Sequence, residues 1–206
     1  MSTPQRVLVL FAHPALHKSR TNRKLIEGVE ALDGITFHDL YEAYPYLHID
    51  VAAEQALLLE HDIVVFHFPF YWYSTPAILK EWQDLVLEHG WAYGHTGNAL
   101  RGKRLLCVTT TGGREDAYQP DGHNRFTMRQ LLAPLEATAN LCGMGFLPPF
   151  VVHGTHLLDE DAMEHHHSDY RRILLALRDG RIDPERASLF PRLNTDLEAI
   201  FVDEEG

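Results

Sequence analysis

The chain contains only two cysteines, Cys107 and Cys142, and each lies inside an apolar pattern. Two thiols cannot build a disulfide framework, and their spacing matches neither a zinc site nor a redox C-x-x-C motif. Free cysteine is among the residue types most often found inside proteins, so we expect both thiols to be buried. The sequence therefore argues against a disulfide scaffold and against thiol chemistry.

Basic residues are scarce, because 18 Lys and Arg stand against 29 Asp and Glu, which gives a formal net charge of −11. Nucleic acid and anionic membrane surfaces are therefore not expected as direct partners. The N-terminal apolar run at residues 7–12 is too short for a signal peptide or a membrane span. We expect a cytoplasmic protein.

The glycine-rich phosphate loops of nucleotide-binding proteins are also missing. No G-x-x-x-x-G-K-[ST] occurs, and CGMGF precedes Leu-Pro-Pro and a strand, so it does not form the dinucleotide fingerprint. These absences argue against a kinase or an ATPase.

Apolar runs and helical patterns alternate along the chain. Runs typical of buried strands lie at residues 7–12, 35–40, 63–68, 105–110 and 146–153, the last interrupted by Pro148-Pro149. Helical patterns lie at 25–34, 54–60, 75–86, 126–142 and 159–180. This order predicts an α/β fold with helices on both faces of a parallel sheet. Right-handed crossovers favour a five-stranded, flavodoxin-like order 2-1-3-4-5.

The predicted domain occupies residues 1–180. Residues 181–206 contain prolines, end in acidic residues and read as a C-terminal tail. We expect this tail to be either an arm on a partner subunit or partly disordered.

In such sheets ligands bind at the carboxyl ends of the strands. The stretch FAHPALHKSRTN follows the first strand and places Ser19, Thr21 and Asn22 at a helix start, where Lys18 and Arg20 add positive charge. Unpaired backbone N–H groups at a helix start favour a phosphate. Ordinary capping of the helix is the alternative interpretation.

Two further loops follow the third and fourth strands. In FPFYWYSTPAILKEW, Pro69 ends the strand and four aromatic residues, 70–73, could stack on a flat ring, although they could also fill a core or an interface. In TTTGG, two glycines allow close backbone approach, although alone the string indicates only a turn. Taken together, the three loops fit a flavin mononucleotide.

Histidines invite a metal interpretation at His165 to His167 and at His153-x-x-His156. Consecutive helical residues do not share a face, so the triple run cannot supply three ligands to one ion. We predict no metal site.

These segments make the sequence similar to the flavodoxin-like NAD(P)H:quinone oxidoreductases. The strings AHP…S-x-x-N, FPFYWYSTPAILKEW, GWAYG and TTGG follow the family's order. IDVAAEQALL and LYEAYP resemble the ancillary subunits of bacterial glutathione-gated potassium efflux systems. Those subunits bind FMN, reduce quinones, and dock on and help activate a membrane antiporter.

The resemblance implies a set of site residues. Flavin contacts are implied at His13, Ser19, Arg20, Thr21, Asn22, Pro69, Phe70, Tyr71, Trp72, Tyr73, Thr110, Thr111, Gly112 and Gly113. Tyr118 and His123 resemble the catalytic Tyr and His beside the flavin in mammalian members, with a spacing one residue shorter here. Trp91 and Tyr93 match aromatic residues that roof the substrate pocket.

The implied activity is ping-pong, two-electron hydride transfer from NAD(P)H through FMN to a quinone, in a homodimer. FMN is preferred over FAD because the shorter bacterial members bind FMN. The alternatives are a regulatory subunit that binds and activates a potassium efflux antiporter at the inner membrane, and an azo- or nitro-compound reductase on the same fold. The choice between NADH and NADPH stays open.

Overall fold

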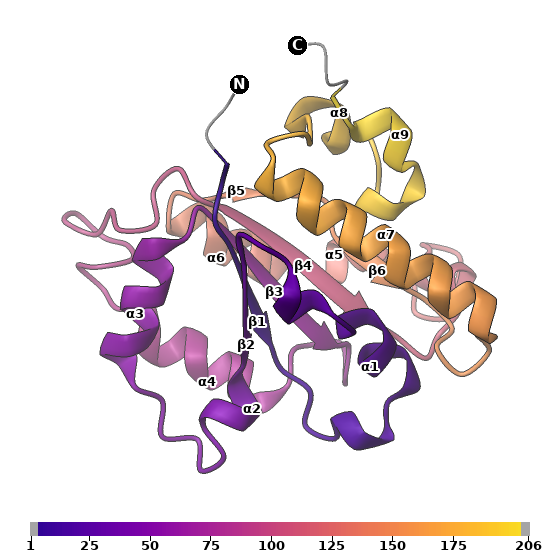
Figure 1. Ribbon diagram of the computed structural model, residues 1–206, viewed down its shortest axis with the longest axis horizontal. Helices are drawn as coiled ribbons and strands as arrows, with labels where there is room; N and C mark the ends of the chain where they lie inside the picture. The colour runs from indigo at the N-terminus through magenta and orange to yellow at the C-terminus, as the bar shows by residue number, and fades with distance from the viewer. Residues whose placement is uncertain (1–3, 203–206) are drawn as a thin grey trace.

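The computed structural model describes residues 4–202, and a parallel sheet forms its centre (Figure 1). Within these residues the sheet contains β1 (Val7–Phe11), β2 (Ile35–Asp39), β3 (Ile63–Pro69), β4 (Arg104–Thr110), β5 (Gly145–Phe146) and β6 (Phe150–Val152). The strand order is β2-β1-β3-β4-β5, and β6 also pairs with β4. The predicted order is thus confirmed. The predicted fifth strand is two short strands, because Pro148 and Pro149 between them have no N–H to donate.

Helices cover both faces of the sheet (Figure 1). On one face Leu8 and Leu10 pack in a core that includes helices α3 (Val51–Glu60), α4 (Ala77–Val86) and α6 (Ala133–Leu141). On the other face Val7 and Val9 pack in a core that includes α1 (Arg20–Ile26) and α7 (Glu160–Arg178). Neighbouring strand residues point to opposite faces, so a continuous apolar run can serve both cores.

Several helix boundaries differ from the predicted ones, and α3 begins at Val51, three residues before the predicted start. The predicted helix to residue 34 ends at Ile26, because Gly28 adopts a left-handed φ of 68° before a short 3-10 turn. The predicted helix over 126–142 divides at Leu132 into α5 (Met128–Leu131) and α6. The helix predicted over 75–86 begins at Ala77, directly after Pro76. The segment after β2 also contains an unpredicted short helix, α2 (Leu40–Ala43), capped by Asp39.

Residues 181–202, here named the C-terminal segment, fold back onto their own chain. They form α8 (Pro184–Ser188), a 3-10 turn (Leu193–Thr195) and α9 (Leu197–Ile200), which lie beside α7 (Figure 1). Ile182, Ala187 and Ile200 are buried in the α7-side core. These residues therefore form neither an extended arm nor a disordered tail, and residues 203–206 lie outside the described residues.

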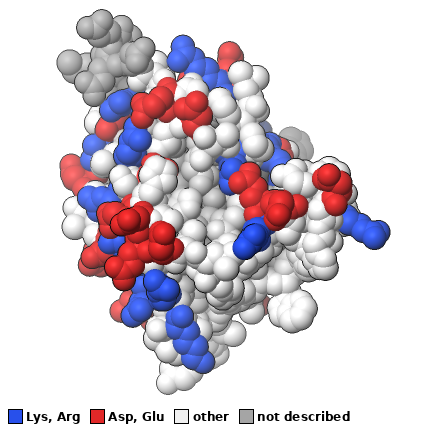
Figure 2. All heavy atoms as spheres, turned by 90° about the vertical axis from the view of Figure 1, so that its right-hand side faces the viewer, with Lys and Arg blue, Asp and Glu red and all other residues white. Residues whose placement is uncertain are grey.

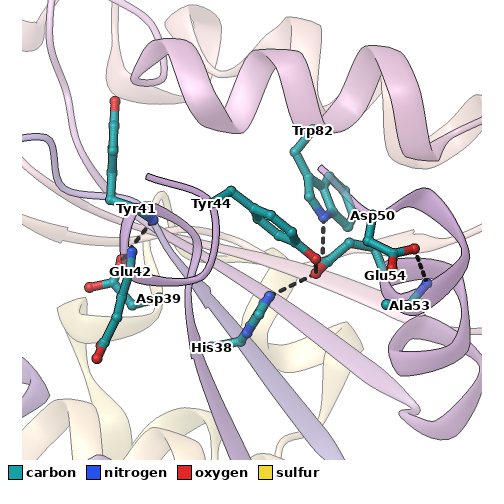
Figure 3. A network of polar contacts seen from close by, with 9 residues as sticks. All are labelled: His38, Asp39, Tyr41, Glu42, Tyr44, Asp50, Ala53, Glu54 and Trp82. Atoms are coloured by element: carbon teal, nitrogen blue, oxygen red, sulfur yellow. Dashed lines mark hydrogen bonds and ion pairs between the residues drawn. The ribbon is translucent and has the colours of Figure 1, made fainter. Parts of the chain in front are cut away.

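A buried carboxylate joins several elements on the other face (Figure 3). Glu54 of α3 is 1% exposed and accepts hydrogen bonds from His38 Nε2 at 2.8 Å, Tyr44 Oη at 2.6 Å and Trp82 Nε1 at 2.7 Å. Burial raises the pKa of Glu54, but the three hydrogen bonds together outweigh it and hold the pKa below its usual range. The carboxylate thus ties β2, the segment after α2, and α4 to α3.

Acidic and basic groups are interspersed on the face seen in Figure 2. The net negative charge therefore does not form a field of one sign over that face. Among the described residues, no helix is long and apolar enough to cross a membrane.

Candidate functional site

A cavity of about 350 Å³ opens at the carboxyl ends of the strands. It is lined by His13, Ala15, Lys18, Ser19, Arg20, Thr21, Asn22, Pro69, Phe70, Tyr71, Thr110, Gly112, Thr155 and His156. The loops after β1, β3 and β4 therefore converge as the sequence predicted. A fourth loop, after β6, joins them.

The loop after β1 is held by Asn22, which is 2% exposed. Its backbone N–H and its Nδ2 both donate to Ser19 Oγ, at 3.1 and 3.0 Å, and Nδ2 also donates to Thr110 Oγ1 at 2.9 Å. Ser19 thus caps α1, while Asn22 ties this loop to the loop after β4. The Oδ1 atom of Asn22 is buried without a partner among the described residues. An unpaired buried acceptor needs a donor, such as a bound molecule or water.

The side chains of this loop that line the cavity differ in charge. Lys18 and Arg20 line the cavity, and within residues 4–202 neither makes an ion pair. His13 is buried, and its Nδ1 accepts a hydrogen bond from the Ala15 N–H at 3.1 Å. Burial lowers the pKa of His13, which favours the neutral imidazole. The cavity therefore offers two cationic side chains on an otherwise acidic chain.

Two of the four aromatic residues in the loop after β3 line the cavity, and two do not. Phe70 is buried and Tyr71 half-exposed, and both line the cavity. Trp72 and Tyr73 do not, since Trp72 is 94% exposed and Tyr73 lines a separate cavity of about 140 Å³. Both have left-handed φ values, 51° and 62°, which cost about 1–2 kcal/mol each in a non-glycine residue. The turn is therefore strained, as is common at functional sites.

The residues at the end of β4 and in the loop after it also differ in whether they line the cavity. Thr110 and Gly112 line the cavity, but Thr111 faces inward, with its Oγ1 2.5 Å from the Tyr118 hydroxyl. A Cβ at Gly113 would meet the Tyr118 ring at 2.9 Å, so a side chain at this position would have to displace Tyr118. Tyr118 is buried and does not line the cavity. It therefore lies behind the cavity wall and contacts it through Thr111.

Three other predicted residues lie away from the cavity lining. His123 is exposed, in the loop that follows Tyr118. Trp91 and Tyr93 are half-buried and pack on the α3–α4 side of the sheet. His165 and His167 of α7 contact Asp169 and the Glu27 carbonyl oxygen, respectively.

Sequence analysis missed Thr155 and His156. A Cβ at Gly112 would approach His156 Nε2 to 3.0 Å, so His156 lies directly on the loop after β4. From the sequence, His156 stands out only together with His153, as a possible pair of metal ligands. The signal that could have identified it is its position after the last strand, because all carboxyl ends of a parallel sheet share one edge.

The buried His67 of β3 lies close enough to His13 for their charges to interact, and it predicts a pH dependence of stability. His67 Nδ1 lies 3.2 Å from the Tyr170 hydroxyl, and Nε2 has no partner among the described residues. Burial, together with the His13 charge, lowers the pKa of His67 to about 3. The unfolded chain therefore binds the extra proton between about pH 3 and 6.5, so acid favours unfolding there by up to about 1.4 kcal/mol per pH unit.

Urea unfolding at pH 7 and pH 5 tests this dependence. His67→Gln should lose less stability than the wild type between these pH values, whereas the matched exposed variant His165→Gln should match the wild type. An equal loss in all three proteins would remove His67 as the source.

Comparison with known proteins agrees with this architecture. A family model described as the flavodoxin-like fold matches residues 5–174. The glutathione-regulated potassium-efflux system ancillary protein KefG of Pectobacterium carotovorum is 48% identical over 163 residues, which cover 79% of this chain and 89% of KefG.

Two solved structures are also similar. General stress protein 14 of Treponema denticola, in complex with FMN, has a TM-score of 0.79 and 38% identity, over 84% of this chain and 99% of that chain. An NADPH-quinone reductase from P. pentosaceus has a TM-score of 0.75 and 36% identity, over 82% of this chain and 96% of its own. With the sheet order, the four converging loops and the match over residues 5–174, the chain belongs to the family with the flavodoxin-like fold.

Proposed function

We propose that the chain binds FMN in this cavity and acts as an NAD(P)H:quinone oxidoreductase with ping-pong kinetics. The observation that carries the proposal is the convergence of Lys18, Arg20 and the unpaired Asn22 Oδ1 with the aromatic residues Phe70 and Tyr71 in one cavity. The FMN complex of the similar Treponema protein supports the choice of cofactor.

The lining residues suit the parts of FMN. Two cationic side chains and the hydroxyls of Ser19 and Thr21 suit a phosphate. Phe70 and Tyr71 suit a flat ring, and Gly112 allows close backbone approach. The buried Asn22 Oδ1 can accept a hydrogen bond from a ribityl hydroxyl or a ring N–H. We propose FMN over FAD, because the similar complex contains FMN.

When bound, FMN supplies a carrier that takes a hydride from reduced nicotinamide and passes two electrons to a quinone. The protein's residues bind, orient and exclude water. Lys18 and Arg20 neutralise the phosphate. The Asn22–Thr110 hydrogen bond fixes the relative position of the two loops that contact the cofactor. We further propose a homodimer, in which Trp91 and Tyr93 help to form the quinone pocket; sedimentation tests the assembly.

Titration of flavin-free protein with FMN, followed by quinone turnover with NADH and NADPH, tests the proposal. We expect stoichiometric binding and turnover with at least one nicotinamide. K18A/R20A should weaken FMN binding about tenfold or more, because charge-assisted hydrogen bonds to phosphate contribute roughly 1.5–3 kcal/mol. The matched control is Arg101→Ala, at an exposed position outside the cavity lining. Absence of FMN binding in the wild type would contradict the proposal.

His123→Ala is expected to slow quinone turnover by about tenfold or more, in the range typical of general acid–base groups. The affinity for FMN should not change, because His123 is exposed and outside the cavity lining. Stopped-flow measurement of the two half-reactions separates these effects, with His165→Ala as the exposed control. Unchanged turnover would remove His123 from the mechanism.

A second candidate function is a regulatory ancillary subunit that binds and activates a potassium efflux antiporter. KefG is 48% identical to this chain, and Glu54 fixes the segment that resembles such subunits. Between the two resembling strings, residues 40–45 and 49–58, Tyr46 is 83% exposed and Leu47 is 44% exposed. Co-purification with the antiporter tests this function, and Y46A should weaken it without affecting FMN. Azo dyes and nitro compounds as electron acceptors in the turnover assay test the third alternative.

A further inference from the structure

The C-terminal segment is an addition to the part of the chain that defines the family. The family match ends at residue 174, and the Treponema protein aligns over 99% of its own length with only 84% of this chain. The family's shared residues therefore do not explain what the segment does.

Two contacts fix the segment's middle on the sheet. The Leu193 N–H donates to the Pro149 carbonyl at 2.9 Å, and the Leu193 side chain is fully buried. The Asn194 side chain forms a pair of hydrogen bonds with Val151, because Oδ1 accepts from the Val151 N–H at 3.1 Å and Nδ2 donates to its carbonyl at 2.9 Å. The backbone beside Arg192 is therefore held against β6 and the residues before it.

From this anchored position Arg192 reaches the loop that follows β4, residues 112–127. Arg192 Nη2 lies 2.7 Å from Glu115 Oε1, and the Arg192 side chain is 19% exposed. Glu115 begins the 3-10 turn Glu115–Tyr118. The last residue of this turn, Tyr118, forms a hydrogen bond with the Thr111 hydroxyl. Thr111 adjoins the cavity-lining residues Thr110 and Gly112. A connected series of contacts thus runs from the C-terminal segment to the cavity wall.

Besides Tyr118, which is buried in the core on the α3–α4 side, few contacts among the described residues hold this loop. Tyr73 Oη donates to Asn124 Oδ1 at 3.1 Å, and Gly154 N–H donates to the Gly113 carbonyl at 2.9 Å. Between the loop and the C-terminal segment lies a cavity of about 190 Å³, lined in part by Tyr118, His153 and Arg192. The loop is therefore not packed tightly against the segment, and the ion pair is the main polar link between them.

We propose that Arg192 is a positioning residue, through which the C-terminal segment holds the loop after β4 in place for the electron acceptor. This inference rests on the proposed function. A partly exposed ion pair contributes little to overall stability. Its effect should therefore be local: it should limit the mobility of the 112–127 loop and so affect the binding of the acceptor.

Hydrogen exchange and steady-state kinetics of Arg192→Gln test the proposal. We expect amide exchange at residues 115–118 to rise about threefold to tenfold, and the KM for the quinone to rise by a similar factor, as expected for a weak pair. The kcat and the thermal midpoint should change little. R192K should restore part of the effect, and the exchanged pair E115R/R192E should restore more than either single reversal.

Arg186→Gln is the matched control, because Arg186 lies in the same segment and pairs with Asp183 inside it. Glu115→Gln removes the same pair from the loop side if Arg192→Gln does not fold. Unchanged exchange at 115–118 in both variants would overturn the proposal, as would increased exchange with unchanged KM. If the wild type binds no FMN, the proposed function fails, and the exchange measurement still decides whether Arg192 holds the loop.

Discussion

Replacing Glu54 by alanine is expected to lower the free energy of unfolding by about 3 kcal/mol or more, because each buried polar group left without its partner costs roughly 1–3 kcal/mol. Three donors lose their acceptor at once. Trp82 Nε1 is the most affected, since Trp82 is 1% exposed and its hydrogen bond to Glu54 is buried. Urea unfolding at pH 7, followed by circular dichroism, measures the loss.

The control is Glu42→Ala, on α2, where the side chain is exposed and the expected change is within about 0.5 kcal/mol. The pKa of Glu54 is lowered in the folded state. Its contribution is therefore present above the unfolded pKa and is lost as the pH falls through the folded pKa. E54Q should flatten that part of the acid profile. A loss below about 1 kcal/mol in E54A would show that the network contributes little.

Asn22→Asp is expected to weaken FMN binding by about 100-fold or more, because placing like charges together costs several kcal/mol. The substitution puts a carboxylate in the cavity proposed for the phosphate. It also removes the Nδ2 donor that joins Ser19 and Thr110. Fluorescence titration of FMN gives the dissociation constant.

Asn140→Asp, at an exposed position of α6, makes the same chemical change away from the cavity and should leave FMN binding unchanged. The thermal midpoint of flavin-free Asn22→Asp separates a local effect from misfolding. Asn22→Ala removes the hydrogen bonds without adding charge, so the difference between the two variants isolates the charge. An N22D dissociation constant within about threefold of the wild type would place the phosphate elsewhere.

Local patterns predicted most of the sheet. The runs beginning at Val7, Ile63 and Leu105 became β1, β3 and β4 with boundaries within a residue, because strands buried on both faces have a strong apolar signal. The rule that ligands bind at the carboxyl edge then predicted which loops meet. Gly28 shows the limit of this approach, because a single left-handed residue ended a helix that the apolar pattern continued.

Side-chain direction was not available from the sequence. Tyr118 resembles a residue beside the flavin, yet its hydroxyl turns to Thr111 behind the cavity wall. The contact between Asn22 and Thr110 joins residues 88 positions apart, and no local pattern reports such a pair. Glu54 and the C-terminal segment were missed for the same reason, since their partners come from distant elements.

The hydrogen bonds of Asn194 also affect how two molecules of this protein can associate. Among the described residues β6 pairs only with β4, so its outer side is an edge of the sheet, and the apolar residues Phe150, Val151 and Val152 form it. An open edge can recruit a strand from another chain and begin aggregation. The Asn194 amide occupies both backbone groups of Val151, much as a neighbouring strand would. The same side chain thereby makes the edge a poor template for intermolecular β-pairing.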